Sequence, residues 1–208
     1  SVVPKPYQDP HPPIFQPFST SPMTVRWAAT QGLIPITMFA PIILAKWYAE
    51  LYQSTAAKSG FDFALGQNMG LLRGFSIHSS RIAAQEAMDR WEVLAWRDWY
   101  GSFGHLQGFK FPDEEGPVPL PGETVTERLT KVGLLIGGSV DDVKRDLEQQ
   151  LATVPFEYLV WHLPYAAMPL GEALNQLELF ATKVMPEFGF EPPDPPVVRQ
   201  PAMKAGVR

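Results

Sequence analysis

The stretch "PIFQPFSTSPMTVRWAATQGLIPITMF", Pro13 to Phe39, decides the fold class, because it holds a strand, a helix and a second strand. Short apolar runs predict strands over 13–18 and 33–39. Between them, Pro22 stands where the first turn of a helix tolerates proline, and Gly32 stands where a helix commonly ends. The stretch therefore predicts a strand–helix–strand unit, the building block of a parallel sheet.

The same unit recurs further along the chain. Apolar runs predict a third strand over 70–78 and a fourth over 156–163, and helical patterns follow the second, third and fourth strands. The run after Ser139 adds one more helix, with that serine as its N-cap. Repeated units of this kind favour a parallel sheet covered by helices.

Two segments interrupt this order. Residues 105–130 carry prolines and glycines without a clear period, so we expect an inserted, lid-like loop. The tail over 190–208 is rich in proline and lacks apolar periodicity, so we expect it to be poorly ordered or draped over a neighbour. Residues 1–189 then form one folding unit. Four units are too few for an eight-stranded barrel, which typically takes about 250 residues, so the chain has the content of half a barrel.

Composition excludes several classes of function. The net charge of −5 gives no basic surface for nucleic acid, and the apolar runs are shorter than the roughly 20 residues that span a membrane. With no cysteine and four scattered histidines, we expect no bound metal. No signal peptide opens the sequence, so we expect a cytoplasmic protein. The charged fraction of 19% is below the usual value of about 25%, so we expect part of the surface to be covered by something else.

Three runs carry a family resemblance when they are taken in order. The runs "PKPYQDPHPPIFQPFSTSPMTVRWAATQGL", "GGSVDDV" and "ALNQLELFATKVMPEFG" resemble the C-terminal half of the bacterial luciferase-like flavin monooxygenases, from about Val3 to Gly189. The resemblance implies a (β/α)8 TIM barrel, of which this chain supplies strands five to eight. It also implies reduced FMN as cosubstrate, or the deazaflavin F420 in a sister branch. An N-terminal half, from the same gene or another subunit, and a flavin reductase become the expected partners, in an oligomer.

The hydroxyl cluster after the first strand is the clearest candidate binding site. A strand that ends in Ser-Thr-Ser-Pro before a helix offers unpaired N–H groups, a positive helix end and hydroxyl donors, which together suit a phosphate. The simpler alternative is that Ser21 only caps the helix. The resemblance implies that Ser21 and Thr24 hold the FMN phosphate, with Thr20 where bacterial luciferase has an acidic residue. Phe18, which closes the strand, joins these cofactor-binding candidates.

Further candidates lie at the other strands. The resemblance implies a flavin-wall role for Phe39, although an aromatic residue there also suits a plain core. Arg73, within an apolar strand, is costly to bury unless it is paired or serves a ligand. It matches an active-site arginine of the alkanesulfonate monooxygenase relatives, and a structural ion pair is the alternative. His78 and His162 lie near carboxyl ends of strands, where barrel active sites gather, so both are catalytic candidates beside possible structural roles.

Three functions remain open from the sequence. The first is a monooxygenase that uses reduced FMN and O2 on a small organic substrate, with catalysis needing the N-terminal half. The second is an F420-dependent oxidoreductase. The third is a flavin-binding or subunit-like protein without catalysis.

Overall fold

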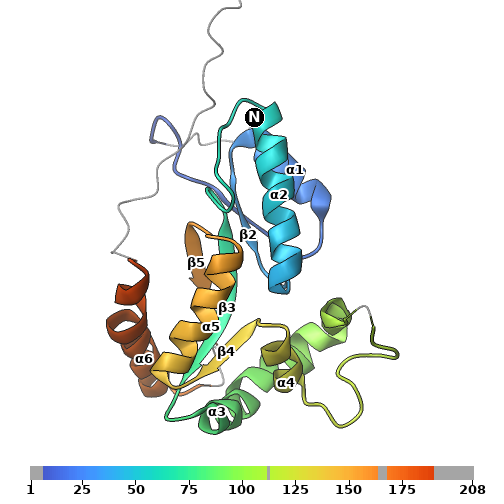
Figure 1. The fold of residues 1–208 in the computed structure, drawn as a ribbon, viewed down its shortest axis with the longest axis vertical. Helices are drawn as coiled ribbons and strands as arrows, with labels where there is room; N and C mark the ends of the chain where they lie inside the picture. Colours follow the sequence, from blue (N-terminus) through green and yellow to red (C-terminus); the bar gives the residue numbers. More distant parts are fainter. Residues whose placement is uncertain (1–6, 112, 164–167, 190–208) are drawn as a thin grey trace, which may run out of the picture.

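A single parallel sheet organises the described residues, which are 7–111, 113–163 and 168–189 of the computed structural model (Figure 1). Its strands are β1 (Phe15–Phe18), β2 (Ile34–Thr37), β3 (Gly70–Ile77), β4 (Leu135–Gly138) and β5 (Tyr158–Trp161). Every pairing between these strands is parallel. The α/β class with a parallel sheet, predicted from the repeated units, is thereby confirmed.

β3 is the centre of the sheet. β5 pairs with its first half, Gly70 to Arg73, and β2 pairs with Gly70 and Leu71 on the opposite edge. β4 pairs with the second half of β3, where the N–H groups of Gly74 and His78 donate to it. Because alternate residues of a strand hydrogen-bond to opposite edges, β2 and β4 lie end to end along one edge of β3. The long strand thus holds three neighbours.

Helices lie at both ends of this sheet. The α-helices are α1 (Pro22–Gln31), α2 (Ile42–Lys58), α3 (Arg81–Val93), α4 (Val125–Lys131), α5 (Val140–Thr153) and α6 (Leu170–Leu179). The π- and 3₁₀-helical segments are η1 (Leu94–Trp99), η2 (Tyr100–Phe103), η3 (His105–Phe109), η4 (Phe180–Val184) and η5 (Met185–Phe188). In Figure 1, α1 and α2 lie beside β2, whereas α3 and α4 lie at the far end beyond β4.

The predicted elements are present, with shorter strands and two differences. β4 is a strand that the sequence pattern did not predict, because its four residues end in two glycines. The expected loop over 105–130 is partly helical, since it contains η3 and all of α4 except its last residue. The expected tail over 190–208 lies outside the described residues.

Ion pairs hold the insertion that we expected over 105–130 against α4. Arg128 of α4 is fully buried and pairs with Glu114 at 2.8 Å and with Glu123 at 2.7 Å. Lys131 adds a contact to Glu114 at 3.2 Å. The neighbouring guanidinium holds the pKa of Glu114 down at about 2, so this carboxylate stays ionised at neutral pH. The two glutamates precede α4, so the cluster ties the irregular chain to that helix.

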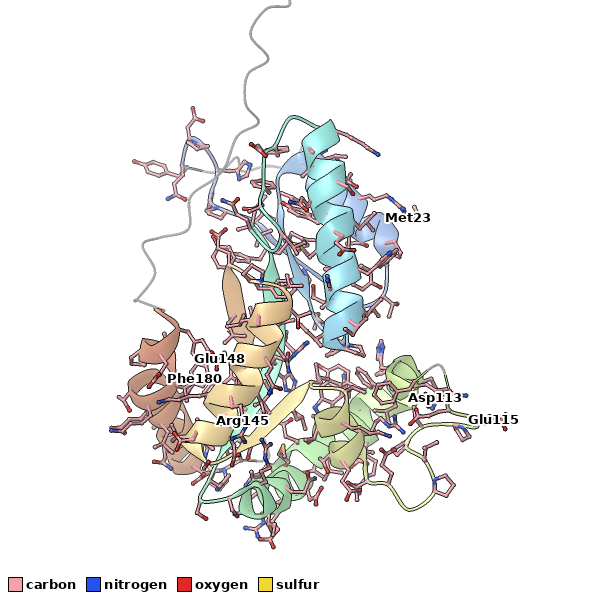
Figure 2. All side chains as sticks on the ribbon, in the orientation of Figure 1. Met23, Asp113, Glu115, Arg145, Glu148 and Phe180 are labelled. Carbon is pink, nitrogen blue, oxygen red and sulfur yellow. The ribbon has the colours of Figure 1, made fainter. Side chains whose placement is uncertain are left out.

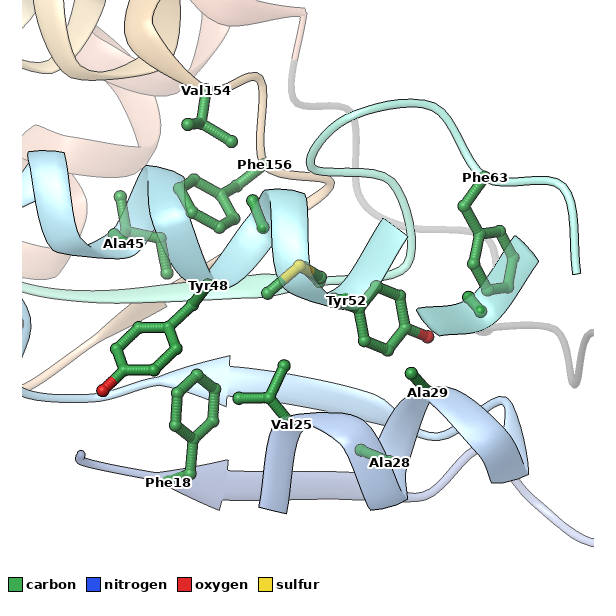
Figure 3. Close-up of a cluster of buried hydrophobic side chains, with 14 of the residues drawn as sticks. Phe18, Val25, Ala28, Ala29, Ala45, Tyr48, Tyr52, Phe63, Val154 and Phe156 are labelled. Carbon is green, nitrogen blue, oxygen red and sulfur yellow. The ribbon is translucent and has the colours of Figure 1, made fainter. Parts of the chain in front are cut away.

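The two faces of the sheet have different covers. Phe18, Thr37 and Leu71 lie in register on one face, and the buried cluster of Phe18 and Leu71 packs them against α1 and α2 (Figure 3). The adjacent positions point to the opposite face, because side chains alternate along a strand. That inner face carries Phe15 and Tyr158, whose rings lie 5.3 Å apart.

Much of the inner face is open. Phe15 is 37% exposed, and Ile36, Tyr158 and Val160 are half-buried. Toward the carboxyl ends of the strands, α3 closes this face, with Met88 and Ala84 directly over Gly137 of β4. The sheet therefore has one helix-covered face and one face that is covered only at its carboxyl end.

Two general features complete the description. Within the described ranges, no helix is both long and apolar enough to cross a membrane. No three side chains of His, Asp or Glu in that part of the chain gather closely enough to hold a metal ion.

Candidate functional site

The hydroxyl cluster forms the N-terminus of α1. The Ser21 side chain accepts a hydrogen bond from the Thr24 backbone N–H at 3.3 Å, so the serine is the N-cap. Thr20 and Ser21 are exposed, Thr24 is half-buried, and the first turn carries no acidic residue. Met23, 77% exposed, projects away from the body of the protein in Figure 2. The Ser21 hydroxyl hydrogen remains available, so capping and anion binding are compatible here.

Phe18 is the last residue of β1 and directly precedes the hydroxyl cluster. Its ring is 5% exposed and contacts Tyr48 of α2 edge-on, with centroids 4.9 Å apart. The side chain belongs to the core between the sheet and α1 and α2 (Figure 3). Its contacts are those of a core residue, and a role toward a cofactor stays a prediction.

Phe39 lies in an aromatic cluster just beyond the carboxyl end of β2. The cluster also contains Trp96 at 5.1 Å, Tyr100 at 4.9 Å and His105 at 5.8 Å between ring centroids. Phe39 is 7% exposed, because η1, η2 and η3 cover it. The ring therefore lines a closed aromatic cluster, and its predicted role as a flavin wall is untested.

His162 reaches the same cluster from β5. Its backbone N–H donates to the Arg73 carbonyl at 2.8 Å, which continues the β-pairing one residue past the strand. Its imidazole lies 5.5 Å from the Trp96 ring and 6.3 Å from the Tyr100 ring, between centroids. Two predicted site residues, Phe39 and His162, are thus brought together through Trp96.

Glu92 of α3 is the functional candidate that the sequence reading missed. Its Oε2 lies 3.7 Å from His162 Nδ1 and accepts a hydrogen bond from Trp96 Nε1 at 3.2 Å. Both the Glu92 and the His162 side chains are 4% exposed. Glu92 and Trp96 are one helical turn apart, on the side where Met88 is also buried. A carboxylate at a core position of a helix is the signal that could have identified it.

Burial sets the charge of this pair. Desolvation raises the pKa of Glu92 to about 8, against a smaller lowering effect from the Trp96 hydrogen bond. Desolvation also lowers the pKa of His162, which favours the neutral imidazole. At neutral pH, the site therefore holds a protonated carboxyl beside a neutral imidazole.

Gly74 of β3 lies beside this pair. A Cβ at that position would lie 3.5 Å from Glu92 Oε1 and 3.5 Å from the His162 carbonyl oxygen. It would also lie 2.5 Å from Leu135 Cδ2, which is closer than real Cβ contacts allow. Glycine is therefore required by the close approach of Leu135 of β4, whereas the contacts with Glu92 and His162 would be ordinary van der Waals contacts.

Arg73 lies on the opposite face of β3 from this cluster. It shares that face with Phe75 and Ile77, which pack against α5 and η4. Arg73 is fully buried, and its Nε donates to Gln150 of α5 at 2.7 Å. Burial lowers its pKa to about 9, so the guanidinium remains charged at neutral pH. Its Nη1 also donates to the Leu72 carbonyl at 2.8 Å, so these partners are a neutral amide and a backbone carbonyl rather than the carboxylate of the expected ion pair. Arg73 lies on the helix-covered side of β3.

His78 is separate from both groups. It lines an open groove of about 650 Å³ between α3 and α6, together with Trp91 and Asn175. Its Nε2 is buried and makes no hydrogen bond with the residues that the structure describes. The structure therefore places the predicted residues in five separate locations: the α1 terminus, the core beneath α1 and α2 with Phe18, the aromatic cluster, the α5 face and this groove.

Comparison with known proteins shows which proteins share this fold. No family model matches the chain. A curated relative, the uncharacterised protein y4wF of Sinorhizobium fredii, is 25% identical over 191 residues, which are 89% of this chain and 51% of the relative.

Solved structures give closer fold matches. The oxygenating constituent of 3,6-diketocamphane monooxygenase from Pseudomonas putida, in complex with FMN, superposes with a TM-score of 0.71 at 16% identity, over 85% of this chain and 49% of that one. Monooxygenase RslO1 from Streptomyces bottropensis gives 0.67 at 17% identity, over 89% and 51%. A coenzyme F420-dependent tetrahydromethanopterin reductase from Methanopyrus kandleri gives 0.55 at 18% identity, over 85% and 51%.

These matches show the fold that the chain shares with monooxygenases and with an F420-dependent reductase. The chain spans about half the length of each of these proteins.

Proposed function

We propose that this chain is the C-terminal half of a flavin-dependent monooxygenase of the luciferase-like type, which uses reduced FMN and O2 on a small organic substrate. The superposition on an FMN complex, over 85% of this chain and about half of that protein, carries the proposal. It matches the order of motifs that resemble the same family in the sequence. Catalysis then needs the other half of the barrel.

The N-terminus of α1 is the proposed phosphate site. Exposed hydroxyls at Thr20 and Ser21, the side chain of Thr24 and a first turn without carboxylates form a donor set that fits a phosphate dianion. Bound reduced FMN would supply the electrons that activate O2. The protein's part is to hold the phosphate, to place the ring near Phe39 and His162, and to keep water away.

The open inner face supports a missing half. In a closed barrel, residues such as Phe15, Ile36 and Tyr158 would pack against four further strands. β1 pairs only with β2, and β5 only with β3, among the described strands, so each has an edge to offer. We propose an N-terminal half, from the same gene or another subunit, as the partner that covers this surface, in an oligomer served by a flavin reductase.

FMN binding tests the phosphate site. Ser21→Ala with Thr24→Ala should weaken FMN binding by one or two charge-assisted hydrogen bonds, each worth about 1.5–3 kcal/mol. Riboflavin has no phosphate, so its affinity should be nearly unchanged. Thr30→Ala, at the other end of the same helix, is the matched control. Equal losses for FMN and riboflavin would mean that the cluster is only a helix cap.

The partner is tested on the native protein. Mass spectrometry of the purified complex should show a polypeptide or segment that supplies four more strands. A lone 23.2 kDa species that stays monomeric at high concentration would overturn the half-barrel proposal.

F420 is the second candidate cofactor, favoured by the similarity to the F420-dependent reductase. Parallel titrations with FMN and F420 distinguish the two. Tight binding of F420 alone, with hydride transfer and no consumption of O2, would replace the monooxygenase by an F420-dependent oxidoreductase. Binding of flavin without any turnover in the complete protein would leave the third, non-catalytic function.

A further inference from the structure

We propose that Glu92 and His162 form the proton-transfer pair of the flavin site, in which Glu92 supplies a proton through His162 to an anion formed on the bound reactants. The inference rests on the proposed function. No sequence motif pointed to Glu92, and His162 was a candidate only because it lies near the end of a strand.

Position is the first argument. Tyr158, Val160 and His162 alternate along β5 on the inner face, and the first two are half-buried. His162 is buried where α3 begins to cover that face. The pair therefore lies at the carboxyl end of the strands, the end at which barrel enzymes carry their active sites.

Geometry is the second argument. Glu92 Oε2 and His162 Nδ1 are 3.7 Å apart, so a small side-chain rotation would bring them within hydrogen-bond distance. Trp96 Nε1 donates to the same oxygen at 3.2 Å and would stabilise the carboxylate after the proton has left.

The surroundings are the third argument. Among the described residues, the Tyr100 ring of η2 lies 6.3 Å from His162, and the His105 ring of η3 lies behind it, 6.1 Å from Tyr100. The Trp96 ring packs on the imidazole at 5.5 Å. Aromatic rings thus cover most of the pair and leave both side chains 4% exposed, which matches the raised pKa of Glu92 and the lowered pKa of His162.

The transfer can be written so that charge balances. The neutral imidazole gives its Nε2 proton to the anion, while the Glu92 Oε2–H bond breaks and its proton moves to Nδ1. Glu92 is left as a carboxylate, His162 remains neutral in the other tautomer, and the anion becomes neutral. Solvent returns one proton to Glu92 before the next turnover.

The test uses the complete protein with its partner half, with FMN affinity measured first by fluorescence titration. Activity should fall as the pH rises through about 8, because Glu92 must be protonated. Glu92→Gln should keep FMN affinity, lower the rate by about 100-fold and remove that fall. Glu86→Gln, at an exposed position of the same helix, is the control and should behave as the wild type.

A spectroscopic measurement covers the case in which Glu92→Gln does not fold. Infrared difference spectra between neutral and alkaline pH should show, in wild type, the carbonyl band of a protonated carboxyl that disappears near pH 8. That band should be present in Glu86→Gln and shifted in His162→Gln.

The outcomes separate the two proposals. Normal FMN binding with a wild-type rate and pH profile in Glu92→Gln would overturn the proton-transfer pair and leave the flavin function standing. Absence of the carboxyl band would overturn the pair as well. Failure of the wild type to bind any flavin would overturn both.

Discussion

Gln176 of α6 completes the edge of β3 beyond the end of β5. Its Oε1 accepts from the Ile77 N–H at 2.7 Å, and its Nε2 donates to the Ile77 carbonyl at 2.8 Å. Both residues are almost fully buried. Gln176→Leu keeps the side-chain size but leaves two buried backbone groups without these partners, each at about 1–3 kcal/mol. The unfolding free energy should therefore fall by about 2–6 kcal/mol.

Urea unfolding, followed by far-ultraviolet circular dichroism, measures this loss. Asn175→Leu changes a neighbouring exposed amide and should stay within about 0.5 kcal/mol of wild type. Hydrogen exchange should show the Ile77 amide losing protection in Gln176→Leu, more than other β3 amides lose. A stability change no larger than that of Asn175→Leu would refute the argument that this side chain replaces a strand.

Three further outcomes are expected. Gln150→Leu should lower the unfolding free energy by about 1.5–3 kcal/mol, because the Arg73 Nε loses its acceptor. Adding Arg73→Met should recover most of that loss, and a double-mutant cycle in which the two losses simply add would contradict the coupling. Burial raises the pKa of Glu92, so between about pH 4.5 and about pH 8 the unfolded chain has lost this proton while the folded chain keeps it. The unfolding free energy should therefore fall across this range, and Glu92→Gln should flatten the fall in urea titrations. The lowered pKa of His162 reduces the unfolding free energy only below about pH 6.5. Arg128→Met should speed proteolytic cleavage within 105–131 while the rest of the chain stays resistant, and equal cleavage in wild type would show that the ion cluster does not hold the insertion.

The fold could be predicted because its signals are local. Pro22 and Gly32 mark the ends of α1, and both Ser21 and Ser139 are N-caps in the structure, as expected. β4 could not be predicted in the same way, because a strand of four residues ending in Gly-Gly has too little pattern of its own. It exists because β3 is long enough to pair with it after β2 has ended.

The site was harder to predict, because it depends on which face a strand presents. Alternation along a strand puts Arg73, Phe75 and Ile77 on one side of β3, but α5 and η4 decide which face of the sheet that side belongs to. Periodicity also could not bring Glu92 to His162, since the two are far apart in the chain and meet only when α3 covers the sheet. The hydroxyl cluster at α1 was accessible to sequence because its chemistry lies within a few adjacent residues.

The length of β3 has a consequence for how the protein unfolds. β2, β4 and β5 each pair with β3, and among the described strands none of these three pairs with another of the three. Detaching β3 would therefore leave only the β1–β2 pair of the sheet. The other strands can fray singly while the rest persists. The slowest-exchanging amides should therefore lie in β3, and their exchange should report the complete opening of the molecule.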